Sequence, residues 1–261
     1  MSTDKQAGNV YLIGAGPGDP DLLTVKAARV LGQCDVVLYD RLVGPGILAL
    51  ARPDAELIYV GKHAGEKEHT QDRIFTLLLK YALAGKTVAR LKGGDPLVFG
   101  RGAEEWAIAL EHGIAVEFIP GVTSASAVPG LAGIPITHRE VSQSFTVITG
   151  HCSQGLHQQW ENYAKVDTLV VLMGVKNREF IAQSLIDAGR DDGQAIAFIE
   201  RGSTPEQRVI VSDLGSVARG EVEVQNPAVF VIGEVVRLRA KLMERAHVAD
   251  LAAELADPAR M

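Results

Sequence analysis

The sequence has few of the residues from which metal centres and disulfide frameworks are built. Its 261 residues include two cysteines, Cys34 and Cys152, whose spacing matches neither a disulfide framework nor a pair of metal ligands. No two of the seven histidines form a close pair, and none of them has a cysteine or carboxylate at a spacing typical of metal ligands. We therefore expect no metal, and we expect Cys34, which stands in an apolar stretch, to be a buried thiol.

Positive charge and long apolar runs are also scarce. A formal net charge of −6 leaves no general excess of basic residues, so nucleic acid is not an expected partner. No apolar run approaches the roughly 20 residues of a membrane span, and the polar start Met1–Gln6 lacks the core of a signal peptide. We expect a cytoplasmic protein with no membrane partner, whose 47% hydrophobic share can form an ordinary core.

Strands and helices alternate in the first half of the chain. Helical periodicity predicts a helix that Asp21 caps and that ends near Gly32. It predicts another that Thr70 caps, that runs through Lys80 and that Gly85 stops, and a third over Arg101–Glu111. Short apolar runs predict strands at Val10–Ile13, Val36–Tyr39, Leu57–Val60, Thr87–Leu91 and Ile114–Ile119. Such alternation is typical of a mostly parallel sheet with helices on both faces.

The composition changes at Pro129–Pro135, where glycine and proline predict a linker. A second series of elements follows, in which Ala195–Glu200 and Arg208–Val211 are close enough to form an antiparallel pair. The fold class expected is α/β, with an N-terminal domain over residues 1–133, a C-terminal domain over 140–240, and a tail over 241–261. We expect a ligand cleft between the two domains.

The most informative stretch is Leu91–Arg101, where a strand ends and a helix begins. Adjacent glycines at 93 and 94 allow backbone angles closed to other residues and let a ligand approach the main chain. Asp95 adds a carboxylate acceptor, while Arg101 places a cation at a helix N-terminus, against the helix dipole. Because this charge does not favour the helix, we expect Arg101 to serve a ligand.

The segment Gly14–Pro20 also follows a strand, which raises the question of a dinucleotide site. The fingerprint needs a third glycine at position 19, which is Asp19, and Pro17 removes a backbone donor. Phosphate binding is therefore disfavoured, and a non-phosphorylated ligand fits better. There is no Gly-x-Ser-x-Gly elbow and no Walker loop.

Polar residues follow other strands of the first half as well. Asp40 and Arg41 come after one strand, and Lys62 and His63 come after the next. Each pair alone is more often the ordinary polar end of a strand. Ligands of α/β sheets bind beyond the carboxyl ends of the strands. Several strands that are each followed by charged residues therefore predict a common site.

Six segments together resemble the tetrapyrrole methylases, most closely those that methylate uroporphyrinogen III with S-adenosylmethionine. These segments are Val10–Thr24, Val37–Val43, Val60–Ala64, Leu91–Glu105, Pro120–Arg139 and Phe145–His151. The resemblance implies a two-domain α/β methyltransferase, usually a homodimer, with the cofactor folded in the interdomain cleft. By motif position, it implies that S-adenosylmethionine, released as S-adenosylhomocysteine, contacts Pro17, Gly93, Gly94, Asp95, Val98, Thr123, Ser124, Met173, Gly202 and Ala228.

The implied reaction is methylation of uroporphyrinogen III at C2 and C7, giving precorrin-2 via precorrin-1. This substrate carries eight carboxylates, so binding it requires cations gathered at the site. Arg41, His63, Arg139 and Arg201 follow strand ends or flank the matched loops, and we expect them to bind the substrate. The resemblance implies Asp40 as proton acceptor and Lys62 as donor, with Arg101 and Glu104 also in the catalytic set. Because guanidinium is not deprotonated in proteins, we expect Arg101 to hold substrate carboxylates and Glu104 to orient it.

Other functions remain open at this point. The same fold could methylate a later corrin precursor or a protein side chain, as in diphthine synthesis. A nicotinamide-dependent oxidoreductase is disfavoured by Pro17 and Asp19. A non-catalytic tetrapyrrole-binding protein would need the cations without the cofactor loop. Whether the product enters sirohaem, cobalamin or haem d1 synthesis is not encoded in these motifs.

Overall fold

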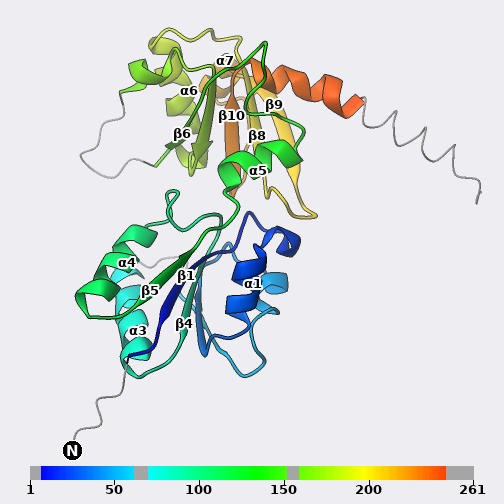
Figure 1. The fold of residues 1–261 in the computed structure, drawn as a ribbon. Helices are drawn as coiled ribbons and strands as arrows, with labels where there is room; N and C mark the ends of the chain where they lie inside the picture. Colours follow the sequence, from blue (N-terminus) through cyan, green and yellow to red (C-terminus); the bar gives the residue numbers. More distant parts are fainter. Residues whose placement is uncertain (1–6, 62–69, 152–158, 245–261) are drawn as a thin grey trace, which may run out of the picture. The chain divides into compact units, whose positions relative to one another are not determined.

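The computed structural model describes residues 7–61, 70–151 and 159–244 (Figure 1). Backbone contacts divide the chain after Ser124 into two compact units, each with its own five-stranded sheet. The domain limits at 133 and 140 stay a prediction. Within the described ranges, no helix is long and apolar enough to cross a membrane.

The first unit contains a wholly parallel sheet in the order β3-β2-β4-β1-β5. Its strands are β1 (Val10–Gly14), β2 (Val36–Tyr39), β3 (Glu56–Tyr59), β4 (Val88–Lys92) and β5 (Val116–Ile119). They lie within one or two residues of the expected positions, which confirms the parallel sheet. The three central strands, β1, β2 and β4, are largely buried on both faces, as parallel sheets require, whereas the edge strands β3 and β5 are partly exposed.

Helices cover both faces of this sheet (Figure 1). Helices α1 (Val25–Leu31) and α2 (Pro45–Leu48) pack on the face that carries Ile13 and Leu91. Helices α3 (Thr70–Leu83) and α4 (Gly102–Glu111) pack on the opposite face, which carries Leu12 and Leu38. Alternate strand residues therefore enter separate cores, as the two-residue period of a strand dictates.

The start of α1 differs from the expectation that Asp21 caps it. Residues Pro20–Leu22 form a 3-10 helix, η1, whose cap is Asp19, and the backbone N–H of Asp21 donates to the Asp19 carboxylate at 2.9 Å. The side chain of Thr24 caps α1 instead, accepting from the N–H of Ala27 at 3.1 Å. Pro20 suits the first position of a separate short turn, which moves the α1 cap three residues along.

The second unit contains a mixed sheet in the order β6-β7-β10-β8-β9. Its strands are β6 (Phe145–Thr149), β7 (Thr168–Leu172), β8 (Ala195–Glu200), β9 (Arg208–Asp213) and β10 (Ala228–Ile232). Among the strands that the structure describes here, β6 and β7 pair in parallel and the other neighbours pair antiparallel. The antiparallel pairing of β8 with β9, expected from their short connection, is confirmed.

Helical segments also cover both faces of the second sheet. Helices α6 (Arg178–Asp187) and α7 (Leu214–Ala218) and the 3-10 helix η2 (Trp160–Tyr163) pack on one face. Helix α5 (Ser124–Leu131) and the 3-10 helix η4 (Glu234–Arg237) pack on the other. A further 3-10 helix, η3 (Val175–Asn177), precedes α6, and residues 238–244 are helical.

Residues 129–135, expected to be a linker, are instead part of the second unit. Pro129 lies inside α5, and Ala132 and Ile134 belong to the buried core beside β7 and β8. Composition suggested a linker because glycine and proline are common in loops. The apolar residues between them pack against the sheet, and this burial decides the outcome.

Candidate active site

Three loops of the first unit meet at the carboxyl edge of its sheet. The register pairs Gly14 with Lys92 and Ile13 with Ile119, so β1, β4 and β5 end side by side. The loop after β1 and the loop after β4 hydrogen-bond to each other: the N–H of Gly94 donates to the Gly16 carbonyl at 2.6 Å, and the reverse bond is 3.2 Å. The sequence-predicted glycine loops therefore form one backbone-lined surface.

This surface requires glycine at particular points. A Cβ atom on Gly121 would lie 2.3 Å from the carbonyl oxygen of Gly94 and 2.6 Å from Cα of Gly14, closer than side chains tolerate. Gly94 has a left-handed φ of 67°, which favours glycine. A Cβ on Gly94 would meet nothing nearer than Ser124, at 3.8 Å. The space into which a side chain at position 94 would point is therefore open, so a ligand could approach the main chain there.

Asp95 holds two of these loops together. One carboxylate oxygen accepts from the N–H of Leu97 at 2.8 Å, and the other accepts from the N–H of Gly121 at 3.2 Å. The predicted cofactor residues Thr123 and Ser124 follow this second loop. A carboxylate oxygen can accept more than one hydrogen bond, so each could also accept from a ligand donor. Asp95 is thus placed to shape the loops and to accept from a bound molecule.

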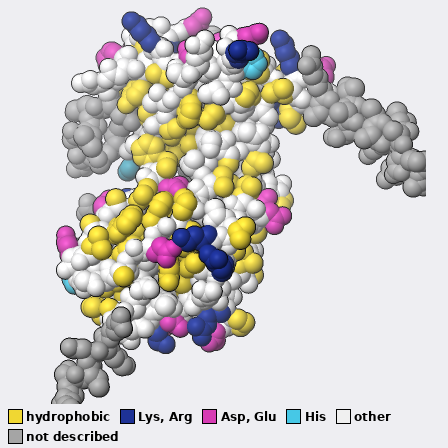
Figure 2. Space-filling view, viewed as in Figure 1, with side chains coloured by type: hydrophobic (Ala, Val, Ile, Leu, Met, Phe, Trp, Pro, Cys, Tyr) yellow, Lys and Arg dark blue, Asp and Glu magenta, His cyan; other side chains and the backbone are white. Residues whose placement is uncertain are grey.

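The loop between β4 and α4 exposes an apolar tip. Leu97, Val98 and Phe99 are 45%, 37% and 43% exposed, and Phe99 has a left-handed φ of 53°. On the face shown in Figure 2, hydrophobic side chains gather in groups, and charged side chains of both signs lie among and around these groups. An apolar tip beside glycine backbone is a surface on which an organic ligand could pack.

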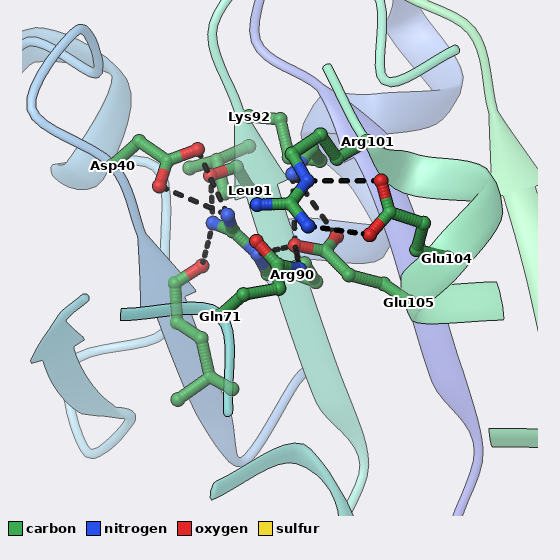
Figure 3. Close-up of polar contacts among 9 residues, drawn as sticks. Asp40, Gln71, Arg90, Leu91, Lys92, Arg101, Glu104 and Glu105 are labelled. Carbon is green, nitrogen blue, oxygen red and sulfur yellow. Dashed lines mark hydrogen bonds and ion pairs between the residues drawn. The ribbon is translucent and has the colours of Figure 1, made fainter. Parts of the chain in front are cut away.

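Arg101 directly precedes α4 and pairs with Glu104, as expected from their spacing (Figure 3). Two parallel bonds, Nε to Oε1 at 2.9 Å and Nη2 to Oε2 at 2.6 Å, join the side chains. Arg101 has a left-handed φ of 58°, which costs a non-glycine residue about 1–2 kcal/mol. The hydrogen bond and charge of Glu104 raise the pKa of Arg101, although partial burial opposes this. Both side chains remain about half exposed, so a carboxylate ligand could reach the guanidinium.

Asp40, the expected proton acceptor, lies at the end of β2 above a buried cluster of charges (Figure 3). Nη2 of Arg90 donates to both Asp40 carboxylate oxygens at 2.9 Å. Nε of Arg90 donates to Glu105 at 3.0 Å, and Nζ of Lys92 donates to the two Glu105 oxygens at 2.9 and 3.0 Å. The amide of Gln71 also donates to Glu105, at 3.3 Å.

This cluster is deeply buried except at Asp40. The side chains of Arg90, Lys92 and Glu105 are 2%, 5% and 0% exposed, whereas that of Asp40 is 29% exposed. Burial, followed by repulsion from Arg90, lowers the pKa of Lys92, and Glu105 opposes this shift. Buried charges persist only when paired and hydrogen-bonded, and the two cations here face two carboxylates.

Sequence reasoning did not single out Arg90, Lys92 or Glu105. One signal was available: Arg90 and Lys92 stand two residues apart in an otherwise apolar strand, so they share a face. Charged residues are rarely fully buried without a partner. A matching carboxylate on a covering helix could therefore have been sought, although its identity as Glu105 comes from the packing of α4.

The other predicted cofactor residues lie at one edge of the second sheet. Because Val229 pairs with Leu172 and Ala228 pairs with Glu200, the end of β7, the end of β8 and the start of β10 share this edge. Met173 directly follows β7, and Gly202 follows β8. A Cβ on Gly202 would lie 2.3 Å from the Val128 side chain, so this loop packs closely against α5.

Two residues at this edge have unusual conformations. Met173 is 52% exposed with a φ of 58°, so it is not an ordinary core methionine. Arg201 has a φ of 46°, and its buried Nε has no hydrogen-bond partner among the described residues. Non-glycine residues with positive φ concentrate at functional sites. Both observations favour the sequence-predicted ligand edge without assigning a role to either residue.

The remaining predicted residues are not brought together by what the structure describes. Arg41 is exposed after β2, and Arg139 is exposed in a turn next to the bridge between His138 and Ser142. Lys62, His63 and Cys152 lie outside the described residues. Cys34 is fully buried, as expected, and burial raises its pKa to about 12. In the described part of the chain, no group of three or more histidine, cysteine, aspartate or glutamate residues could hold a metal ion.

Comparison with known proteins places this site in a family. The model of the tetrapyrrole (corrin/porphyrin) methylases matches residues 9–218. The uroporphyrinogen-III C-methyltransferase of Priestia megaterium is 45% identical over 234 residues, covering 88% of this chain and 98% of that protein. The crystal structure of Thermus thermophilus uroporphyrin-III C-methyltransferase with S-adenosylhomocysteine is 49% identical, with a TM-score of 0.79 over 88% of this chain and 94% of that one.

A siroheme synthase of Azotobacter vinelandii is 51% identical over 242 residues, which are 91% of this chain but 52% of that protein. The chain thus spans about half the length of the siroheme synthases that it matches. The match to the family model covers well over half of the chain and agrees with the paired α/β units and glycine loops. The chain belongs to the tetrapyrrole methylases.

Proposed function

We propose that this chain transfers methyl groups from S-adenosylmethionine to C2 and C7 of uroporphyrinogen III, giving precorrin-2 via precorrin-1. The observation that carries the proposal is the carboxyl edge of the first sheet. There the glycine loops lie on the same edge as Asp40 and the Arg101–Glu104 pair. Similarity along nearly the full length of the Priestia megaterium methyltransferase supports the same reaction.

The glycine loops fit a cofactor that has no phosphate. Gly94 presents an open backbone, and Asp95 offers carboxylate lone pairs to an ammonium group or a ribose hydroxyl. A sulfonium is better accommodated by backbone carbonyls than by cations, and the glycine loops offer main chain rather than cationic side chains. We propose that Pro17, Val98, Thr123 and Ser124 complete the first unit's share of the contacts. Met173, Gly202 and Ala228 remain proposed contacts from the second unit.

When bound, the cofactor supplies a methyl group on a cationic sulfur, which an electron-rich pyrrole carbon attacks, so that the sulfur leaves as a neutral thioether. No protein nucleophile is required. The chain's own residues orient the two reactants and accept the proton that the methylated macrocycle releases. Asp40 is the proposed acceptor because its carboxylate is partly exposed at the strand end.

The cations of the site hold the carboxylates of the substrate. The Arg101 side chain is about half exposed, and its ion pair with Glu104 holds the guanidinium in one orientation. If a substrate carboxylate replaced Glu104 in one of its two hydrogen bonds to Arg101, the guanidinium would still donate two hydrogen bonds to carboxylates. We propose Arg41, Arg139 and Arg201 as further partners for this polyanion, with Lys62 and His63 after β3. A homodimer is proposed on the family resemblance, and light scattering in solution would measure it.

The test is a methyl-transfer assay with S-adenosylmethionine labelled in its methyl group and uroporphyrinogen III kept reduced. Two labelled methyl groups should enter the macrocycle, at positions identified by NMR. Asp40→Asn should reduce turnover about a hundredfold or more while cofactor binding by calorimetry is unchanged. Absence of label with wild-type protein would refute the function, and label confined to a later corrin precursor would reassign the substrate.

A further inference from the structure

Arg90 connects the proposed proton acceptor to the interior of the first unit. One guanidinium nitrogen, Nη2, binds both oxygens of Asp40, and another, Nε, binds Glu105. The third nitrogen, Nη1, donates to the carbonyl of Leu91 at 3.2 Å and lies 3.5 Å from that of Leu38. The whole guanidinium is therefore engaged, and its plane is determined by partners on β2, β4 and α4 (Figure 3).

Glu105 in turn prevents Arg90 from moving. It is completely buried and accepts from Arg90, Lys92 and Gln71. A planar guanidinium with two widely separated donor edges can bind two carboxylates at once, whereas an ammonium is a point charge. Asp40 is the one member of this cluster exposed enough to meet a substrate.

The cluster is also balanced in charge. Arg90 and Lys92 supply two positive charges, and Asp40 and Glu105 supply two negative charges. Loss of one partner from a buried ion pair leaves a charge without compensation, which is strongly unfavourable. The Asp40 carboxylate is thus held in one orientation by a buried cation.

We propose that Arg90, held by Glu105, is a positioning residue that orients the Asp40 carboxylate toward the proton it accepts. The inference rests on the proposed function, because that function gives Asp40 its role. Arg90 itself touches no reactant. Its effect on turnover is exerted entirely through Asp40, and this dependence separates positioning from a general contribution to folding.

The experiment is a double-mutant cycle between Arg90→Lys and Asp40→Asn, with single-turnover methyl transfer as the readout. Arg90→Lys keeps the charge but cannot bind both carboxylates, so the rate should fall about ten- to a hundredfold, with the KM for S-adenosylmethionine unchanged. In the Asp40→Asn background the same change should alter the rate less than about twofold. Equal losses in both backgrounds, or no loss in either, would overturn the inference.

Arg190 provides a matched control. It is a buried arginine of the second unit whose guanidinium donates to the carbonyls of Tyr163 and Val166. Arg190→Lys should change the methyl-transfer rate by the same small factor with Asp40 or with Asn at position 40. A rate loss confined to the Asp40 background would show that any buried arginine has this effect, which would contradict the assignment to Arg90.

A second variant tests the inference if Arg90→Lys does not fold. The double change Arg90→Met with Glu105→Gln removes one cation and one anion, so the remaining charges of Lys92 and Asp40 balance. This protein should bind the cofactor normally and lose turnover to nearly the level of Asp40→Asn. Wild-type turnover in this folded variant would refute the positioning role. An inactive wild type would instead refute the methyltransferase function, and the inference with it.

Discussion

Replacement of Glu105 by glutamine is the most demanding test of the buried charge cluster. The carboxylate is fully buried and accepts from Arg90 at 3.0 Å and from Lys92 at 2.9 and 3.0 Å. Glutamine has nearly the same shape, so the change removes a charge while leaving almost no cavity. It turns a neutral cluster into one with a net positive charge.

The expected loss follows from the burial of both cations. Removal of one partner from a buried pair costs about 3–5 kcal/mol in the free energy of unfolding. Because about 1 kcal/mol corresponds to roughly 4 °C in the melting temperature for a unit of this size, the melting temperature should fall by about 12–20 °C. The exposed neighbour Glu104 is the matched control, and Glu104→Gln should cost less than about 1 kcal/mol.

The loss should also depend on pH in a definite direction. Burial lowers the pKa of Lys92, so between that pKa and its ordinary value the folded chain binds fewer protons than the unfolded chain. Between these two pKa values, the contribution of Lys92 to the free energy of unfolding therefore rises as the pH rises. Glu105 opposes the shift, and its removal should lower the pKa further. The loss in the free energy of unfolding caused by Glu105→Gln should consequently be larger at pH 7 than at pH 9.

Thermal unfolding followed by circular dichroism at both pH values would measure these differences, with urea unfolding giving the free energies. A loss at pH 7 no greater than that of Glu104→Gln would refute the view that Glu105 neutralises two buried cations. A deficit that grows with pH would refute the role assigned to Lys92. A double variant with Lys92→Met should recover part of the stability, since it removes the uncompensated cation.

Two further predictions concern other parts of the first unit. Cys34 should resist alkylation at pH 8 in the native protein and react after unfolding, because burial raises the pKa of its thiol to about 12. Peptide mass spectrometry would measure the labelling. Labelling of Cys34 in the native protein would contradict the prediction. Gly121→Ala should weaken binding of S-adenosylmethionine at least about tenfold, because the new Cβ would lie 2.3 Å from the Gly94 carbonyl and displace the glycine loops. Calorimetry would measure the affinity. The matched control is Gly130→Ala, whose Cβ would meet no atom within 4 Å and whose backbone has no left-handed φ, so it should leave binding intact.

Much of the local structure could be predicted from the sequence. The strands Val36–Tyr39 and Ala195–Glu200 have the bounds expected from their apolar runs, because such short runs ended by polar residues have few alternatives. The start of α1 could not be predicted because Asp19, Asp21 and Thr24 are all competent caps. Their competition is settled by where Pro20 begins its own turn.

The glycine loops and the polar strand ends were also recognisable in the sequence, since parallel strands bring their carboxyl ends to one edge whatever covers the sheet. The sequence alone could not reveal that Gly121 must accommodate the Gly94 carbonyl. That requirement arises from the distance between two loops that are far apart in the chain. The sequence likewise predicted the Arg101–Glu104 pair, because residues three apart at a helix start are neighbours.

The sequence by itself determined the alternation of strands and helices, the parallel first sheet and the loops that resemble the family. These features depend on local periodicity and on residues close together in the chain. Only the tertiary structure decided that Arg90 meets Asp40, 50 positions away, and Glu105, 15 positions away. Burial makes an unpaired charge costly, so the packing of α4 against the sheet determines which charges pair. The orientation of the proposed acceptor is consequently a property of the folded unit.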